Sequence, residues 1–495
     1  MLLFAAHAAW CVATTSGTYD ETTYLRFGRG LRQSRDVETI AGWGVAPLPI
    51  WVLAAPAIAD APSYTRAVTI ARGAAIALFG VPLLAMLWWT LRRTSSRSIA
   101  IAGTLFVALS PNIVAHASLT TSDVCFVAAA LATLAALTQH LERRTSASRA
   151  WLTLALSIAF AAKYSALVLV PVVAVASALW PGPAPRSPLR RIADAAGLAA
   201  LTFVAALIVV WALHLFALVP FGLPPLETVR LPASIVGIAR QLHHQALGEP
   251  AFLLGERSRS GWWYYTPLAL AMKSTPAEVI VGIAAFAAVA ATAARPTVHR
   301  VVSSVAFVAF WIAGLLNHLD VGIRYELVLV PLAVMLCAER WPAPSIAWAL
   351  VAAQVASAIA IAPHDLGYVN VFAGGPARGY TKLADSNIDW GQDLPALAIA
   401  LARAGAARPI VSYFGTAPIE EYGIHADRWE AHAGEPLGRW DWIAISATNL
   451  DGVYLRSDPF SAMRPLEPDA RAAYSILLYR ADRVDVRQAL HGVVR

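Results

Sequence analysis

Long apolar blocks separated by short charged loops fill most of the chain up to residue 362. Blocks of this length cross roughly 30 Å of hydrocarbon as helices. The predicted spans lie near residues 1–15, 66–91, 98–117, 122–140, 150–162, 165–180, 193–217, 264–293, 301–317, 321–338 and 345–362. The two spans that flank Lys163 are each short, so a single kinked or re-entrant element is an alternative there. The pattern predicts a mainly α-helical membrane domain over residues 1–363, with about eleven transmembrane helices.

The remaining residues, 364–495, are polar enough to form a domain outside the membrane. Short strand-like runs at 409–414, 442–446 and 474–479 alternate with a helical stretch over 395–406, which predicts a small α/β domain.

The composition of the chain agrees with a membrane part and a smaller polar part. Hydrophobic residues make up 58% of the chain, charged residues only 14%, and the mean hydropathy is +0.57, values typical of a multi-spanning membrane protein.

The arginines between apolar blocks fall on alternate loops. Loops rich in arginine are typical of the cytoplasmic side of a membrane protein. These arginines are Arg92, Arg93, Arg97, Arg143, Arg144, Arg149, Arg186, Arg190, Arg191, Arg295, Arg300 and Arg340. This pattern predicts a cytoplasmic N-terminus and places loops 16–65 and 219–263, together with the C-terminal domain, outside. The net charge of +7 therefore reflects topology and does not indicate nucleic-acid binding. The bias toward Ala and Arg indicates a bacterium, and hence its inner membrane.

Several carboxylates follow the predicted outer ends of spans. Asp20 and Glu21 come directly after the first span, and Asp123 begins the fourth, shortly after His116. Ionisable groups that face a cavity at the end of a span are candidate functional residues. Helix capping or a solvated loop is the alternative for the first pair, and helix capping for Asp123.

Basic residues form a second group of candidates. Arginine recurs every third residue at Arg26, Arg29, Arg32 and Arg35, which predicts a basic amphipathic helix that either holds phosphate or anionic headgroups or is merely solvated. Only three of the 38 basic residues are lysines, namely Lys163, Lys273 and Lys382. The first two lie within or at the end of apolar segments, where a compact cation suits a phosphate oxygen. Arg324 extends this set, unless it only snorkels to the interface.

No recognised nucleotide-binding or metal-binding spacing is present. His243 and His244 with Glu249 and Glu256 lack the spacing of metal ligands, so we predict no metal site from them. The sequence indicates no cofactor and leaves a requirement for a divalent cation open.

Taken in order, these motifs resemble the GT-C membrane glycosyltransferases of family 39, which are related to protein O-mannosyltransferases and the lipid A aminoarabinose transferase. The resemblance rests on short motifs spread over most of the chain: residues 19–21, 110–112 with His116, Thr121 and Asp123, 163–164, 255–256, 261–265, 273–276 and 322–325. A further stretch, 385–394, which contains Asp385, Asp389 and Gln392, resembles one found in a bacterial subgroup and has no assigned role.

The resemblance implies that a sugar moves from a polyprenyl-phosphate donor to a hydroxyl of a lipid, glycan or protein acceptor outside the membrane. By resemblance, Asp20 is the general base and Glu21 its neighbour, while Lys163, Lys273 and Arg324 hold the donor phosphate. His116, Asp123 and Tyr265 are expected in the sugar or acceptor pocket. Direct displacement with inversion needs only one base and cations for the leaving phosphate, although a retaining route with a second carboxylate stays open. A transporter or flippase of lipid-linked glycans is the main alternative, and a ligase that moves a whole glycan is another.

Overall fold

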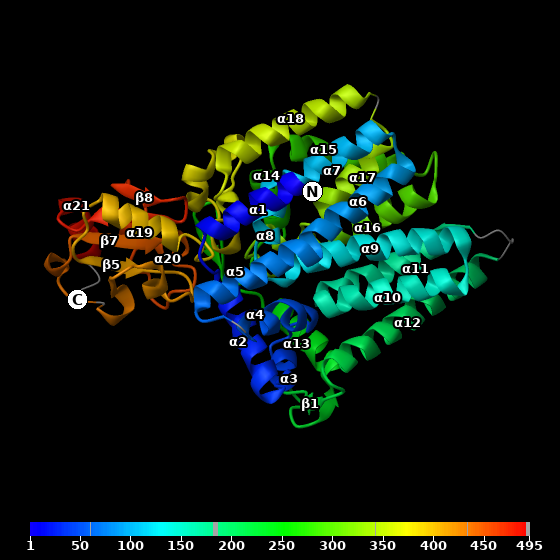
Figure 1. The fold of residues 1–495 in the computed structure, drawn as a ribbon, viewed down its shortest axis with the longest axis horizontal. Coiled ribbons are helices and arrows are strands. Elements are labelled where there is room, and N and C mark those ends of the chain that lie inside the picture. The colour runs from blue at the N-terminus through cyan, green and yellow to red at the C-terminus, as the bar shows by residue number, and fades with distance from the viewer. Residues whose placement is uncertain (60, 182–186, 342, 433, 492–495) are drawn as a thin grey trace.

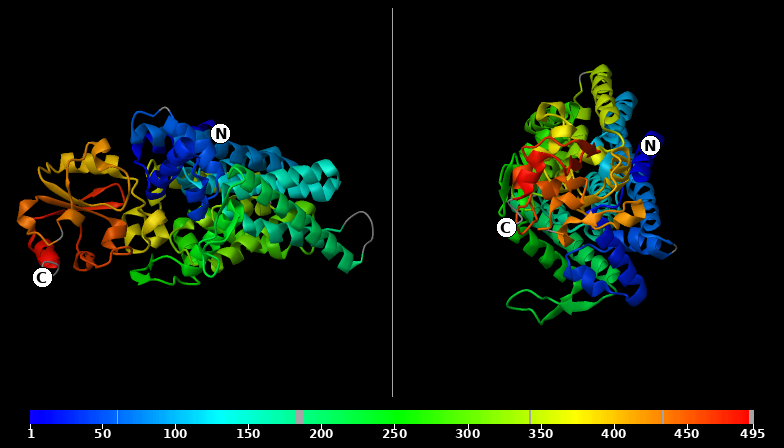
Figure 2. Two further views of the ribbon diagram at one scale, coloured as in Figure 1. Left: turned by 90° about the horizontal axis from the view of Figure 1, so that it is seen from below. Right: turned by 90° about the vertical axis from the view of Figure 1, so that its left-hand side faces the viewer.

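The protein is described by a computed structural model over residues 1–59, 61–181, 187–341, 343–432 and 434–491. A helical bundle and a small α/β domain lie end to end along the long axis of the molecule (Figures 1 and 2). The mainly helical fold class with a small C-terminal α/β domain, predicted from the hydrophobic pattern, is confirmed.

Each predicted span corresponds to helical structure in the bundle. The elements are α1 (Leu2–Thr14), α5 (Tyr64–Ala75), η2 (Ile76–Gly80), α6 (Val81–Thr94), α7 (Arg97–Ala108), α8 (Pro111–Ala117), α9 (Ser122–Arg143), α10 (Ser146–Ala162), η3 (Tyr164–Val168), α11 (Leu169–Leu179), α12 (Pro188–Leu213), α14 (Tyr265–Lys273), α15 (Pro276–Ala290), α16 (Val298–Leu315), η4 (Ile323–Tyr325), α17 (Leu329–Ala338) and α18 (Pro344–Ile361). Among the described residues, five helices are long and apolar enough to cross a membrane, or six if the bent pair α7 and α8 is one span. Several other predicted spans are shorter apolar helices, so the count of eleven stays a prediction.

Helix breaks place polar residues at one end of the bundle. The axis bends by 64° between α7 and α8, where Pro111 occupies the first turn of α8 and the Ser110 hydroxyl accepts from the Ile113 amide at 3.4 Å. The chain breaks again at Lys163, which is extended between α10 and η3. A third break separates α14 from α15, where Thr275 and Glu278 form a capping box.

The predicted arginine loops meet at the other end of the bundle. Arg93 pairs with Glu142 at 3.1 Å, and His299 approaches the same carboxylate at 3.5 Å. Arg300 pairs with Glu339 at 2.7 Å. Arg186, also used in the topology prediction, lies outside the described residues. The gathering of these loops far from the α/β domain (Figure 1) is the arrangement that the predicted orientation requires.

The two predicted external loops fold into small elements at the end of the bundle that meets the α/β domain. The first holds α2 (Tyr19–Ser34), α3 (Val37–Gly42), η1 (Ile50–Ala54) and α4 (Ala55–Ala59), and the second holds β1 (Leu218–Pro220), β2 (Arg230–Pro232), α13 (Ala233–Leu247), β3 (Ala251–Leu253) and β4 (Glu256–Ser258). Helix α2 is the predicted basic amphipathic helix. Its apolar residues, among them Phe27 and Leu31, are buried while its arginines stay exposed.

The α/β domain is built on a five-stranded sheet of order β6-β5-β7-β9-β8. Its strands are β5 (Pro409–Ser412), β6 (Asp427–Arg428), β7 (Trp442–Ser446), β8 (Ala470–Ala472) and β9 (Ile476–Arg480). Strand β5 runs parallel to β6 and β7, and β9 runs antiparallel to β7 and β8. Alternate strand residues pack on α19 (Leu394–Arg403) at one face and on the core around α21 (Val484–His491) at the other. The predicted strands and helix therefore correspond to β5, β7, β9 and α19.

A segment of short turns, residues 364–393, joins the bundle to this domain, and we call it the junction. It contains η5 (Asp365–Gly367), η6 (Val371–Ala373), η7 (Pro376–Thr381) and η8 (Asp385–Asn387). Gly322 lets η8 approach η4 closely, because a Cβ there would lie 2.2 Å from the Ser386 hydroxyl. The domain boundary predicted at residue 364 thus falls at the start of the junction, whose turns pack against both parts.

Candidate active site

Asp20 and Arg324 form an ion pair at the end of the bundle that faces the α/β domain. The Arg324 Nη1 donates to Asp20 Oδ2 at 2.6 Å. Asp20 lies in the first turn of α2, where the helix dipole favours a carboxylate, and Arg324 lies in η4. The Asp20 side chain keeps 33% of its surface exposed and Arg324 keeps 14%, so both remain accessible to a ligand.

A second pair lies between Lys163 and Asp123. The lysine Nζ donates to Asp123 Oδ1 at 2.6 Å, and the Thr121 hydroxyl donates to Oδ2 at 2.9 Å. The break between α10 and η3 brings Lys163 to the first turn of α9, which carries Asp123. His116 Nδ1 lies 3.8 Å from Asp123 Oδ2, too long for a hydrogen bond. Asp123 therefore holds a cation in addition to opening its helix.

Two aromatic rings connect these ion pairs. The Lys163 Nζ lies 4.3 Å from the centre of the Tyr325 ring, and the Arg324 guanidinium lies 4.4 Å from the Trp390 ring and 5.3 Å from Tyr325. The His116 ring is 6.2 Å from Trp390. Such cation–π contacts stabilise a desolvated cation by about 2 kcal/mol. We call the seven residues the cation cluster: Asp20, His116, Asp123, Lys163, Arg324, Tyr325 and Trp390.

Two nitrogens of the cation cluster are buried without a partner. Within the described part of the chain, Nε of Arg324 and Nδ1 of His116 make no hydrogen bond. A buried polar group left unpaired costs about 1–3 kcal/mol. An anionic ligand beside Arg324 would satisfy its free donor, and planar guanidinium groups suit phosphate oxygens.

A cavity opens beside Tyr325 and Lys163. It has a volume of about 330 Å³, and apolar side chains such as Leu167, Phe310 and Leu316 line it together with Gln241 and Gln245. Tyr325, whose ring contacts Lys163, also belongs to its wall. The wall also carries Asn317 and Glu326, so only its apolar part matches the hydrocarbon of a ligand whose anionic head lies at the cationic site.

Glu21 has a different environment from its neighbour Asp20. Its carboxylate is fully buried, pairs with Arg72 through Nε at 2.8 Å and Nη2 at 2.7 Å, and accepts the amides of Thr18 and Thr120. Burial by itself raises the pKa of Glu21, but the Arg72 guanidinium and these donors lower it overall. With its oxygens engaged, Glu21 anchors α2 to α5 and does not face the cation cluster. Arg72 is a charged residue inside a predicted span. This unusual position is the sequence signal from which a buried ion pair could have been predicted.

The side chains of Lys273 and Tyr265 make hydrogen bonds to the junction. The Lys273 side chain is buried, and its Nζ donates to the carbonyl oxygens of Leu366 at 2.7 Å and Asn387 at 2.5 Å. The Tyr265 hydroxyl accepts from the Asn387 side-chain amide at 2.7 Å. Both residues of α14 thus hold the junction, in contrast to the phosphate-binding and pocket positions expected for them.

The 385–394 stretch ties three parts of the molecule together. Asp389 accepts the Thr448 amide of the α/β domain at 2.9 Å, and the carbonyl oxygens of Trp390 and Gln392 accept the amides of Tyr19 and Ser16. The Gln392 side chain bonds back to the stretch itself. Burial raises the pKa of Asp389 to about 8. The stretch therefore positions the start of α2, which carries Asp20, and brings Trp390 onto Arg324.

Within this stretch, Asp385 interacts electrostatically with Arg324 and Asp20. Its Oδ2 accepts the Tyr454 hydroxyl at 2.5 Å, and Oδ1 accepts the Ser386 amide at 2.5 Å. Burial raises the pKa of Asp385 to about 6, although Arg324 opposes the shift. Its φ of 53° is left-handed, a region that Asp adopts more readily than most non-glycine residues.

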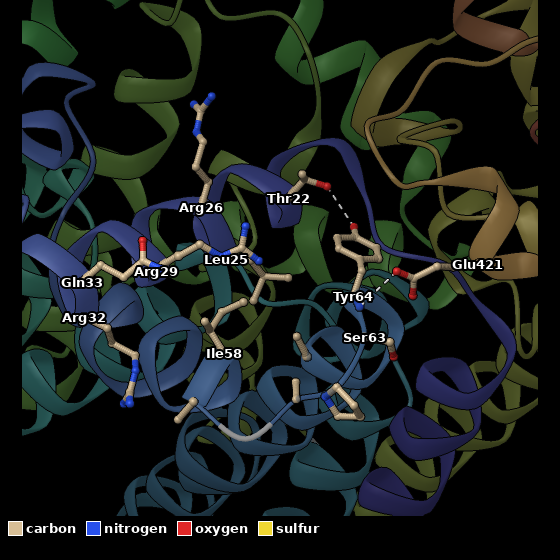
Figure 3. Close-up of a pocket in the computed structure, with 14 residues that line it drawn as sticks. Thr22, Leu25, Arg26, Arg29, Arg32, Gln33, Ile58, Ser63, Tyr64 and Glu421 are labelled. Atoms are coloured by element: carbon tan, nitrogen blue, oxygen red, sulfur yellow. Dashed lines mark hydrogen bonds between the residues drawn. The ribbon is translucent and has the colours of Figure 1, made fainter.

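The arginines of α2 line a separate pocket on the outer surface, with a volume of about 700 Å³. Figure 3 shows Arg26, Arg29 and Arg32 along α2, with Tyr64 and Glu421 at the other side. Glu421 is bonded to the amides of Tyr64 and Thr65 and so is engaged elsewhere. Anion binding by this helix stays a prediction, and we call this feature the arginine pocket.

The histidines of the second external loop form no metal cluster among the described residues, since His244 only pairs with Glu249 at 2.7 Å. His7, Cys11 and Asp365 do bring their ligand atoms within 4.8 Å of one another. Asp365 accepts a hydrogen bond from the Cys11 thiol and makes another with His7. These two bonds explain why the three side chains lie close together.

A family model matches part of the helical bundle. Residues 68–211 match the model described as dolichyl-phosphate-mannose-protein mannosyltransferase. The match confirms the resemblance to the family 39 membrane glycosyltransferases and identifies the chain as a glycosyltransferase.

Two solved structures and a search of curated proteins complete the comparison. ArnT from Cupriavidus metallidurans bound to undecaprenyl phosphate is 14% identical, with a TM-score of 0.49 and 98% of each chain covered. The same protein in the apo state is 15% identical, with a TM-score of 0.48 over 99% of this chain and 98% of that chain. No curated protein matches the sequence significantly.

Proposed function

We propose that this glycosyltransferase transfers a sugar from a polyprenyl-phosphate donor to an acceptor hydroxyl on the periplasmic side of a bacterial inner membrane. The observation that carries the proposal is the ion pair of Asp20 with Arg324 beside the pair of Lys163 with Asp123. The description of the matching family model, which names a lipid-phosphate-linked sugar, supports this donor class. The cavity beside Tyr325 suits the first isoprene units.

In this proposal, the cations hold the phosphate and a carboxylate accepts the proton. Lys163 and Arg324 bind the donor phosphate, whose oxygens also satisfy the free Nε of Arg324. The phosphate then competes with Asp20 for the guanidinium, so donor binding frees the carboxylate. Asp20 accepts the acceptor hydroxyl proton as the acceptor oxygen attacks the anomeric carbon. The bond from that carbon to the phosphate oxygen breaks, and polyprenyl phosphate leaves with its charge stabilised by both cations.

The chemistry requires only one carboxylate near the reacting carbon, which favours inversion in a single displacement. Asp123 and His116 act indirectly in this scheme. Asp123 holds the Lys163 ammonium group in position within the cation cluster. We assign Glu21, Lys273 and Tyr265 to positioning, on the contacts described above.

The test is an assay of the purified chain in nanodiscs with a panel of radiolabelled polyprenyl-phosphate sugars and membrane extract as acceptor. We expect labelled product and released polyprenyl phosphate from the wild type, and a loss of at least about 100-fold in Asp20→Asn. Glu38→Gln is the matched control, because Glu38 lies in the same external loop and pairs only loosely with Arg230, at 3.5 Å on the surface. Donor binding without turnover in any of these proteins would contradict the proposal and favour a transporter or flippase.

A further inference from the structure

Three aromatic rings from two distant parts of the chain stack beside the cation cluster. Tyr19, at the start of α2, stacks on Phe414 with ring centres 5.4 Å apart and planes 17° apart. Phe414 stacks in turn on Tyr454, again at 5.4 Å and with planes only 3° apart. Phe414 follows β5, and Tyr454 follows α20 (Ala447–Leu450), so the α/β domain supplies two of the rings. We call this group the aromatic stack.

Hydrogen bonds attach both ends of the aromatic stack to the active site. The Tyr19 amide donates to the Trp390 carbonyl oxygen at 2.8 Å, and Tyr19 is the residue before Asp20. At the other end, the Tyr454 hydroxyl donates to Asp385 at 2.5 Å. The electrostatic influence of Arg324 and Asp20 reaches Asp385. A ligand on the stack would therefore lie next to the carboxylate that we propose as the base.

The outer rings of the stack are open to a ligand. Tyr19 is 43% exposed and Tyr454 is 37% exposed, whereas Phe414 between them is only 9% exposed. Aromatic rings bury large apolar areas, and the hydroxyls of the tyrosines supply polar groups at the rim. A sugar ring combines an apolar C–H face with a rim of hydroxyls and matches both features.

We propose that Tyr19, Phe414, Tyr454 and Asp385 form an acceptor subsite that binds a sugar ring of a carbohydrate acceptor next to Asp20. This inference rests on the proposed function and deepens it, because it gives the acceptor a chemical class. In the subsite, the exposed rings of Tyr19 and Tyr454 offer their faces to the C–H face of the sugar, and their hydroxyls contact its hydroxyl groups. Phe414 holds the two rings in place from between them, and Asp385 orients the Tyr454 hydroxyl. The α/β domain is thereby part of the active site.

The first arm of the test measures binding of free sugars to the full-length chain in nanodiscs. The probes are methyl glycopyranosides of neutral, amino and acidic sugars, and the readout is saturation transfer from protein to sugar protons by NMR. Phe414→Leu removes the central ring, while Phe372→Leu removes an 83% exposed ring outside the subsite and serves as the matched control. We expect transfer to at least one sugar class in the wild type and in Phe372→Leu, and its loss in Phe414→Leu.

The second arm measures turnover with membrane extract as acceptor, where the sugar is carried on a larger molecule. We expect the apparent acceptor KM to rise about tenfold in Phe414→Leu, as aromatic contacts of this kind contribute, with the donor KM within about twofold of wild type. Tyr454→Phe keeps the ring and loses the hydrogen bond to Asp385. This variant therefore tests the subsite if Phe414→Leu fails to fold. Far- and near-UV circular dichroism verifies the fold of each variant.

The two arms separate a free sugar from a sugar carried on a lipid or glycan. Loss of binding, or a raised acceptor KM, that is confined to the stack variants supports the subsite. Unchanged values in both arms, or equal losses in Phe372→Leu, overturn it. Absence of turnover in the wild type would count against the proposed function alone, since the first arm needs no donor and decides the subsite independently.

Discussion

The ammonium group of Lys273 donates to the main-chain carbonyl oxygen of Asn387 at 2.5 Å, although the two residues lie 114 positions apart. A lysine of the helical bundle is thereby committed to the junction. Its second bond, to Leu366, leaves little of its hydrogen-bonding capacity for a substrate. The lysines of the bundle therefore have two kinds of role: Lys273 holds the junction, whereas Lys163 lies in the cation cluster.

Lys273→Met is expected to loosen the junction without weakening phosphate binding. Two buried carbonyl oxygens lose their donor, which costs about 2–4 kcal/mol, so the midpoint of thermal unfolding should fall and limited proteolysis within residues 364–393 should accelerate. Inhibition by added polyprenyl phosphate is the second measurement, with Lys163→Met as the comparison. If Lys273→Met weakened that inhibition as much as Lys163→Met while leaving stability unchanged, Lys273 would be a phosphate ligand after all.

Arg324→Lys is expected to lower kcat/KM by about 10–100-fold, because an ammonium cannot reproduce the planar fork of a guanidinium. The loss should appear largely as a weaker donor interaction, since Lys retains the charge next to Asp20. Steady-state kinetics against donor concentration measures it. Arg26→Lys, in the exposed surface of α2, is the control. A fully active Arg324→Lys enzyme would show that a point charge suffices to bind the donor phosphate. It would contradict a contact that needs the planar fork of the guanidinium.

Arg72→Met is expected to destabilise the protein by about 3–5 kcal/mol, because it leaves the Glu21 carboxylate buried without its cation. The double variant Glu21→Gln with Arg72→Met removes both charges and should recover part of that loss. Thermal unfolding in one detergent compares the single and double variants. A single variant as stable as the wild type would contradict a structural role for this pair.

The acid Asp385 should give stability a pH dependence between about 4 and 6. Burial raises its folded-state pKa to about 6 from its ordinary value of 3.8, so the folded state binds the proton more tightly than the unfolded state. Stability is therefore greatest below the unfolded pKa and declines as pH rises through the folded value, by about 3 kcal/mol for a shift of this size. Asp385→Asn, which stays neutral, should flatten the decline between pH 4 and 6 in thermal unfolding measured over pH.

A decline of the same size in Asp385→Asn would show that another group controls stability in that range. Asp389, whose folded pKa is about 8, should add a separate decline that extends to higher pH. Comparison of Asp385→Asn with Asp389→Asn separates the two contributions.

The arginine pocket should bind anionic headgroups. Arg29→Gln combined with Arg32→Gln is expected to weaken binding to anionic lipid by about 1 kcal/mol for each charge removed, and added salt should reduce the difference. Binding of fluorescent phosphatidylglycerol to the protein in neutral nanodiscs measures the effect. Arg439→Gln, an exposed arginine of the α/β domain, is the control. Equal binding by all three proteins would leave α2 with a solvated basic surface.

The sequence by itself determined the apolar helices, the arginine loops gathered at one end and the strands of the α/β domain. These features depend on local periodicity and on the cost of placing charge in hydrocarbon, both of which are readable from neighbouring residues. It also singled out Asp20, Asp123, Lys163 and Arg324, because charges at the ends of apolar segments are few.

Only the tertiary structure decided which of these charges meet. Asp20 and Glu21 are adjacent in sequence, yet one faces Arg324 and the other is buried against Arg72, because successive helical residues point about 100° apart. Trp390 and the aromatic stack join the site through contacts over long sequence separations, which no local pattern encodes. The pairing of distant segments depends on how the junction packs between the bundle and the α/β domain, and this packing converts a set of isolated charges into a site.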